Sequence, residues 1–320
     1  MRERVADLGY ALGWRVAGSA PAPWVGAAFR AGADLAARRG GAGPRQLRAN
    51  LARVLARDGV PPPGPVLDAA VRDGLRSYAR YWTEAFRLSR VDPLARYAAA
   101  DRSITGTGHL DDALAPGRGV IIGLTHSGNW DVAGTWLVEA LRRRGEPASL
   151  TTVAERLRPE SVYRRFLDYR EALGFEVLPA QAGARTIATL AARLRANRVV
   201  CLLADRELGA GGVEVDLFGE PATLPGGPAQ LARHTGAALL PFGGWFTPGG
   251  WGLRFRPPVP VPAPGRGERA GAAVRATTQA LADVFAADIA EHPVDWHMLQ
   301  PVWTADRARA GLGVPSRVAR

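Results

Sequence analysis

The stretch from Gly117 to Gly134 reads GRGVIIGLTHSGNWDVAG, and it predicts a strand, a break and a helix in succession. The apolar run Val120–Leu124 is typical of a short buried strand, and the polar segment 125–128 interrupts it. From Asn129 onward the apolar residues recur at helical spacing. Since open α/β sheets bind their ligands at the carboxyl ends of the strands, we expect the functional site just after this strand.

His126 and Asp131 are the candidate catalytic pair of this stretch. Five helical steps would turn their side chains about 140° apart, so they can meet only if His126 lies off the helix and folds back over its first turn. There the helix dipole would keep Asp131 ionised, and its carboxylate could hold one imidazole nitrogen while the other nitrogen takes a proton. Such a pair also arises by chance, so the spacing alone does not establish catalysis.

Composition narrows the possible functions. The chain has 320 residues, of which 47% are hydrophobic, which is enough for one large α/β domain or two smaller ones. The formal net charge is +11, and all 41 basic residues are arginine. The lack of lysine excludes a P-loop, a pyridoxal-phosphate enzyme and a protein kinase. Arginine binds phosphates through paired N–H groups, so an anionic partner such as a nucleotide-bearing cofactor, a phospholipid headgroup or nucleic acid fits the composition.

Cysteine use and the N-terminus indicate the compartment. Cys201 is the single cysteine, which excludes an internal disulfide and a thiolate metal cluster, and its apolar surroundings favour a small buried residue over a nucleophile. The charged N-terminus does not resemble a signal peptide. No apolar run approaches the ~18 residues of a membrane-spanning helix. We expect a protein that stays in the cytoplasm and can lie on a membrane.

The first hundred residues show helical periodicity. Helices are predicted over residues 4–17, from near Pro23, around residues 47–55, and from about Val66 to Leu88. The first two are amphipathic and rich in Trp, Ala and Arg, which suits a membrane-facing surface. Capping of the protein core explains them equally well.

From Ser103 onward, predicted strands and helices alternate, which favours a mainly parallel sheet flanked by helices on both faces. A closing helix is expected at about 268–291, and the basic tail from Arg307 onward is expected to fray. The predicted strands are Val120–Leu124, Ser149–Val153, Phe175–Leu178, Val199–Ala204, Val213–Phe218, Ala238–Phe242 and Leu253–Phe255, and the helices between them are 129–144, 160–173, 182–196 and 227–236.

Charged side chains follow two further strands. Glu155 comes just after one predicted strand, and Asp205 and Arg206 come just after another, at the sheet edge where His126 is expected. A third candidate is the Gly226-Gly227 turn before a helix, which could accept a phosphate or an oxyanion. A structural salt-bridge network would produce the same charged residues. The histidines lack metal-ligand spacing, and we expect no metal site.

The segment His126-Ser127-Gly128-Asn129-Trp130-Asp131 resembles the H-x4-D/E signature of bacterial membrane-associated acyltransferases, a family that includes the lipid A lauroyl acyltransferases. Within it, the likeness is greatest to the actinobacterial phosphatidylinositol mannoside acyltransferases, and it covers nearly the whole chain. The supporting stretches are Ser77–Trp82, Val153–Ser161, Tyr169–Glu171, Gly174–Pro179, Phe218–Ala222 and Trp296–Gln300.

This resemblance implies a reaction. The enzyme would transfer an acyl chain to a mannose 6-hydroxyl of a phosphatidylinositol mannoside, and the expected acyl donor is palmitoyl-CoA. No covalent acyl-enzyme would form. His126 would take the hydroxyl proton while Asp131 orients the imidazole. Acyl-CoA would be a co-substrate and no cofactor would be needed. The positions Glu155, Arg170, Asp205 and Arg206 would bind the sugar or the CoA phosphates.

The resemblance also implies an organisation and a location. We expect one glycerolipid acyltransferase-like domain over 1–320, with a helical part at 1–100, a catalytic α/β core at 101–305 and a flexible tail at 306–320. It would be a peripheral protein on the cytoplasmic face of the plasma membrane, with an anionic membrane surface as partner and no nucleic acid. The alternatives are acylation of another glycolipid such as lipid A, a thioesterase, and a non-catalytic basic protein bound to anionic lipid or nucleic acid.

Overall fold

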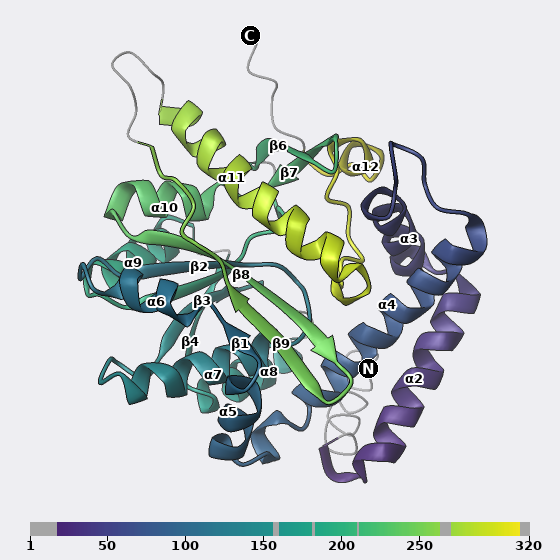
Figure 1. Cartoon of the computed structure of the whole chain (residues 1–320), viewed down its shortest axis with the longest axis horizontal. Coiled ribbons are helices and arrows are strands. Elements are labelled where there is room, and N and C mark those ends of the chain that lie inside the picture. The colour runs from purple at the N-terminus through teal and green to yellow at the C-terminus, as the bar shows by residue number, and fades with distance from the viewer. Residues whose placement is uncertain (1–17, 156–159, 181–182, 210, 263–269, 314–320) are drawn as a thin grey trace.

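The computed structural model describes residues 18–155, 160–180, 183–209, 211–262 and 270–313 (Figure 1). A helical N-terminal part leads into a central sheet with helices on both faces. The predicted α/β class with a mainly parallel sheet is confirmed.

The described residues of the N-terminal part include the helices α2 (Ala22–Arg39), α3 (Ala42–Val54) and α4 (Gly64–Ala85). Prolines at the starts of α2 and α4 are compatible with the first helical turn, which needs no proline N–H, and Gly40 ends α2 in the left-handed conformation. Helix α2 packs along α4 (Figure 1), and the three helices share a small apolar core. The helix predicted over residues 4–17 lies outside the described residues.

The main sheet has the strand order β1-β9-β8-β2-β5-β3-β4. Strand β2 lies between β5 and β8, and both pairings are parallel. The pair β8 and β9 is antiparallel, because a tight turn at residues 248–249 joins two long strands. The strands are β1 (Ile104–Thr105), β2 (Val120–Leu124), β3 (Leu150–Ala154), β4 (Phe175–Pro179), β5 (Val199–Leu203), β8 (Ala238–Thr247) and β9 (Gly250–Phe255).

Alternate side chains of the central strands fill two separate cores. Ile121 of β2 faces one core, and its neighbours Val120 and Ile122 face the other. Since both faces are covered, β2 is an uninterrupted apolar run, as parallel strands usually are. One face packs against α5 (Pro93–Asp101), α6 (Thr107–Leu114), α7 (Trp130–Arg143) and α8 (Glu160–Ala172), and the other against α9 (Ala184–Arg195), α10 (Gly227–Thr235) and α11 (Ala270–Glu291).

The strand predicted at 213–218 does not join the main sheet. It is β6 (Val213–Leu217), which pairs only with the antiparallel strand β7 (Glu220–Leu224) in a separate hairpin. Both turn residues, Phe218 and Gly219, have positive φ angles of 54° and 78°, as two-residue hairpin turns favour. The sequence prediction missed β7 because Pro221 weakens its strand pattern.

The C-terminal region also differs from expectation. Residues Thr304–Arg309 form helix α12, and Arg307 is buried, so the predicted frayed tail does not begin at residue 306. The Arg307 guanidinium donates to the backbone carbonyls of Glu207, Gly209 and Gly313, which compensates its burial. It thereby fixes the loop that follows β5. The short helices η1 (Leu88–Arg90) and η3 (Pro293–Asp295) complete the described elements.

Within the described ranges, every helix is too short or too polar to cross a bilayer.

Candidate active site

Three neighbouring strands bring the charged residues of the predicted site to one edge of the sheet. Strand β5 lies between β2 and β3, and the three run parallel. Their carboxyl ends therefore meet at one edge, where β2 leads into His126, β3 into Glu155, and β5 into Asp205 and Arg206. This edge is the predicted location of the site, because α/β folds bind their ligands at the carboxyl ends of the strands.

The backbone of His126 is held from two sides. Its N–H donates to Asp205 Oδ2 at 2.8 Å, and its carbonyl accepts the N–H of His297 at 2.8 Å. Two residues on, Gly128 has a φ of +58°, and a Cβ there would lie 2.8 Å from the Gly244 carbonyl carbon. Only glycine fits this turn without strain, so the sequence Ser-Gly after His126 sets the direction in which the chain enters α7.

One ring nitrogen of His126 lies against a carboxylate, and the other makes no hydrogen bond to a described residue. Nδ1 lies 2.6 Å from Asp205 Oδ1. Since that carboxylate accepts hydrogen bonds, Nδ1 carries the proton and Nε2 keeps its lone pair. No hydrogen-bond partner of Nε2 is found across the described part of the chain, and the side chain is 23% exposed. His126 can therefore accept a proton from a ligand at the sheet edge.

Asp205 is a buried carboxylate whose charge is compensated. Burial alone would raise the pKa of Asp205, but the positive charge of His126 when its ring is protonated, hydrogen bonds from that ring and from the His126 backbone, and a hydrogen bond from Trp296 Nε1 lower it below its ordinary value. The Trp296 bond is 2.8 Å long. Asp205 thus stays ionised and fixes the imidazole, as the carboxylate of a catalytic triad does.

Asp131 does not hold His126, so the predicted role of Asp131 in orienting the imidazole is wrong. Its Oδ1 accepts from Arg170 Nη2 at 2.9 Å, and its Oδ2 accepts from the Tyr81 hydroxyl at 3.0 Å. The predicted helix begins as expected, with Asn129 capping the N–H of Val132. Asp131 lies in the buried first turn of that helix, whereas His126 stays at the sheet edge. The side chains of His126 and Asp131 therefore point in different directions and do not meet.

Arg170 is buried together with Asp131. The two side chains are 8% and 1% exposed. Burial favours a lower pKa for Arg170, but the charge of Asp131 raises it, and the guanidinium stays charged. A CoA phosphate would have to lose its water to reach this site, so the structure does not support the predicted phosphate-binding role of Arg170.

Glu155 and Arg206 form a second ion pair at the rim. Arg206 Nη2 lies 3.2 Å from Glu155 Oε2, and these side chains are 23% and 50% exposed, respectively. The structure therefore arranges the six predicted site residues as three pairs: His126 with Asp205, Asp131 with Arg170, and Glu155 with Arg206.

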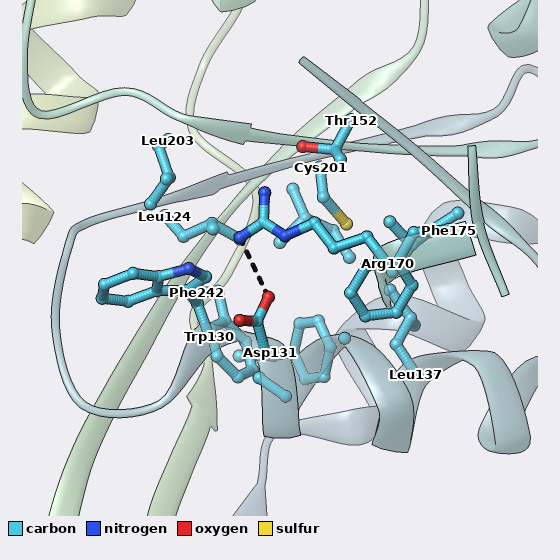
Figure 2. A pocket seen from close by; sticks show the side chains of 15 residues that line it. Leu124, Trp130, Asp131, Leu137, Thr152, Arg170, Phe175, Cys201, Leu203 and Phe242 are labelled. Atoms are coloured by element: carbon cyan, nitrogen blue, oxygen red, sulfur yellow. Dashed lines mark hydrogen bonds and ion pairs between the residues drawn. The ribbon is translucent and has the colours of Figure 1, made fainter. Parts of the chain in front are cut away.

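An apolar pocket lies between the sheet and α7 (Figure 2), and Trp130 in its wall meets the ring of His126 edge-on. Leucines and phenylalanines from the sheet line it, and the Asp131–Arg170 pair reaches into it (Figure 2). Cys201 is part of its wall, and burial raises the pKa of its thiol to about 12. The thiol is therefore unreactive, as its apolar surroundings predicted.

The sequence analysis assigned no chemical role to four further residues that lie around the site: Ser77, Tyr81, Asp295 and His297. The Ser77 hydroxyl lies 2.5 Å from Asp295 Oδ1 and 2.8 Å from His297 Nε2. Ser77 and Tyr81 are four residues apart on α4, a spacing that puts both on one helix face. That spacing is the sequence signal that could have placed Ser77 and Tyr81 together. The contact with Asp295 and His297 spans more than 200 positions and leaves no local pattern.

No cluster of three or more His, Cys, Asp or Glu side chains able to hold a metal ion occurs among the residues described.

We predict that Asp131→Asn destabilises the fold, because it leaves the Arg170 charge buried and unpaired. The expected loss in the free energy of unfolding is about 3–5 kcal/mol, measured by urea denaturation. Asp131→Asn with Arg170→Met should recover much of it. As a control, Asp111→Asn removes a carboxylate from an exposed pair with Arg144 and should change stability by less than about 1 kcal/mol. Wild-type stability in Asp131→Asn would contradict the structural role.

The buried His297 predicts a loss of stability in acid. Burial, and the positive charge of His126 when its ring is protonated, lower the pKa of His297 to about 3, whereas an unfolded histidine titrates at about 6.5. Below the unfolded pKa, the unfolded chain binds a proton that the folded chain does not. The free energy of unfolding should therefore fall by about 1.4 kcal/mol per pH unit until the folded pKa is reached.

The measurement is urea denaturation of the wild type and His297→Gln at about pH 7 and about pH 4.5. The stability of the wild type relative to the variant should decrease at the lower pH, because glutamine takes up no proton. A difference independent of pH would show that His297 titrates normally in the folded state.

Similar proteins identify the family of this chain. The chain is 50% identical over 97% of its length to a phosphatidylinositol mannoside acyltransferase of Mycolicibacterium smegmatis, and the match covers 96% of that protein. It is 52% identical over 94% of its length to the protein of the same name from Mycobacterium tuberculosis, covering 89% of it. The family profile of bacterial lipid A biosynthesis acyltransferases matches residues 3–305. An imidazole with a free nitrogen beside an apolar pocket suits acyl transfer, and the chain belongs to the bacterial lipid A biosynthesis acyltransferase family.

Proposed function

We propose that this protein transfers an acyl chain from acyl-CoA, palmitoyl-CoA in the first instance, to a mannose 6-hydroxyl of a phosphatidylinositol mannoside. The observation that carries the proposal is the His126–Asp205 pair, which lies beside an apolar pocket at the open edge of the sheet. The names of the two mycobacterial relatives support the acceptor class.

His126 supplies the general base. Its Nε2 accepts the proton of the mannose hydroxyl as the oxygen attacks the thioester carbonyl carbon. The C–S bond then breaks, and the CoA thiolate takes the proton back from the imidazolium. Asp205 stabilises the positive charge that forms on the ring between these two steps. Ester and free thiol are the products, and no acyl-enzyme forms.

The apolar pocket holds the acyl chain in this proposal. Its wall residues come from the main sheet and from α7 and α8, and they include Leu124, which ends β2 two residues before His126. In this proposal the thioester end of the chain lies at that end of the pocket. Apolar walls exclude water from the thioester, which disfavours simple hydrolysis. This argues against the thioesterase alternative.

The rim pair Glu155–Arg206 is placed to contact the acceptor. Both side chains are partly exposed at the sheet edge that carries His126. The Arg206 side chain is 23% exposed, so its guanidinium can reach a sugar hydroxyl or a phosphate oxygen. Acyl-CoA is a co-substrate in this scheme, and no other cofactor takes part.

The enzyme would bind the cytoplasmic face of the plasma membrane as a peripheral protein. Trp24 of α2 is 77% exposed, and Leu35 on the same helix is also exposed. A tryptophan in such a position suits a membrane interface, and the net charge of +11 attracts anionic lipid.

We expect His126→Gln to lower acyl transfer by about 10²- to 10⁴-fold, because no base remains. Asp205→Asn should cost about 10³-fold, because an amide donor facing Nδ1 moves the ring proton to Nε2. The assay is mass spectrometry of acylated lipid with purified mono- and dimannosylated phosphatidylinositol and lipid A precursors as acceptors. His234→Gln, an exposed histidine that contacts Arg195, is the matched control and should be fully active.

Each alternative has its own outcome in this assay. Acylation of lipid A precursors in preference to the mannosides would show that lipid A, and not the mannoside, is the acceptor. Release of free fatty acid without acylated lipid would indicate a thioesterase. Full transfer by His126→Gln would overturn the proposed mechanism. Absence of any acyl transfer by the wild type would favour a non-catalytic lipid-binding protein.

Membrane placement is tested by vesicle sedimentation. Trp24→Ser should weaken binding to phosphatidylinositol-containing vesicles several-fold, because a large aromatic ring no longer inserts at the interface. Ile187→Ser on α9, whose wild-type residue is 55% exposed, removes a comparable surface residue outside α2 and should bind as the wild type does. Equal losses in the two variants would show that α2 does not face the membrane.

A further inference from the structure

Two side chains that line the apolar pocket each carry an N–H group with no hydrogen-bond partner among the described residues. Trp130 Nε1 and Arg170 Nε are buried and make no hydrogen bond to any described residue. Both side chains belong to the pocket wall, and Figure 2 shows the indole of Trp130 and the guanidinium of Arg170 reaching into the same space. Leaving a buried donor unpaired costs about 1–3 kcal/mol, so a pair of them beside one cavity points to a ligand with an acceptor atom.

Trp130 lies between the pocket and His126, the proposed general base, and its ring is fixed by its neighbours. Its ring stacks on Tyr81 with a centroid distance of 3.9 Å and meets His126 edge-on at 5.6 Å. Tyr81 is itself fixed by its hydrogen bond to Asp131. The indole therefore touches the imidazole with one part and the acyl pocket with another.

The two donors differ in what they can contribute. Arg170 already compensates the charge of Asp131 through Nη2, and that pair is fixed within the wall. Trp130 is a neutral donor whose N–H meets no acceptor in the described part of the chain, so it can donate to a ligand. A thioester presents one strong acceptor atom, its carbonyl oxygen, next to the carbon that the hydroxyl attacks.

We propose that Trp130 is a catalytic residue whose indole N–H binds the thioester carbonyl oxygen, with Arg170 Nε as the second donor. This inference rests on the proposed acyl transfer. When the hydroxyl oxygen bonds to the carbonyl carbon, the C=O π electrons move onto the oxygen, and Trp130 stabilises the negative charge there. The charge returns to re-form the C=O bond as the C–S bond breaks, and the thiolate takes the proton from His126.

The test is Trp130→Phe, which keeps an aromatic ring against Tyr81 and removes the N–H. We expect kcat to fall by about 100-fold while KM for palmitoyl-CoA changes little, because the hydrogen bond strengthens in the transition state. Trp136→Phe is the matched control on the same helix. It removes an indole N–H that donates to Asp101 at 2.9 Å, and kcat should be unchanged.

Binding of a thioether analogue of palmitoyl-CoA separates catalysis from folding. The analogue has CH2 in place of the carbonyl, so the wild type and Trp130→Phe should bind it with equal affinity in calorimetry. A kcat close to that of the wild type in Trp130→Phe would overturn the inference and leave the proposed function standing. Weakened analogue binding together with lost activity would assign Trp130 to pocket packing and would overturn it too. Absence of acyl transfer by the wild type would instead overturn the proposed function.

Discussion

A single buried carboxylate organises the active-site edge of this protein. Asp205 accepts hydrogen bonds from the ring and the backbone of His126 and from the indole of Trp296. These donors come from the loop after β2 and from the C-terminal segment after α11, whereas Asp205 itself follows β5. An ionised buried group is costly unless it is paired and hydrogen-bonded, so these contacts favour the arrangement that brings the three segments together. The orientation of the imidazole is thus fixed by the same contacts that close the fold.

The two buried carboxylates near His126, Asp205 and Asp131, have different roles because their partners differ. Asp205 holds the imidazole, and Asp131 holds Arg170 and Tyr81 five residues beyond His126. The Asp131–Arg170–Tyr81 cluster supports the wall of the pocket and the ring of Trp130 that stacks on Tyr81. The two carboxylates therefore support activity in different physical ways: Asp205 sets the tautomer of the imidazole, and Asp131 holds the pocket wall in place.

Much of the fold could be predicted because its signals are local. The run Val120–Leu124 and the helical periodicity after Asn129 identified β2 and α7, and alternation of strands and helices predicted the parallel sheet. The partner of His126 could not be predicted. Asp205 is 79 positions away, and only the order β2-β5-β3 brings its strand next to that of His126. Asp131, five positions away, was the more visible candidate, yet the helix turns it into the core. The burial of Arg307 was hidden for the same reason, since its acceptors are backbone carbonyls about 100 positions earlier.

The most direct test of the account is the tautomer of His126, read by ¹⁵N NMR of the imidazole side chains at neutral pH. The chain has five histidines, and the His126→Gln spectrum assigns the signal. We expect a protonated Nδ1 and an unprotonated Nε2 in the wild type, because Nδ1 donates to Asp205. A proton on Nε2 would contradict the account, since the nitrogen that faces the ligand could then accept no proton.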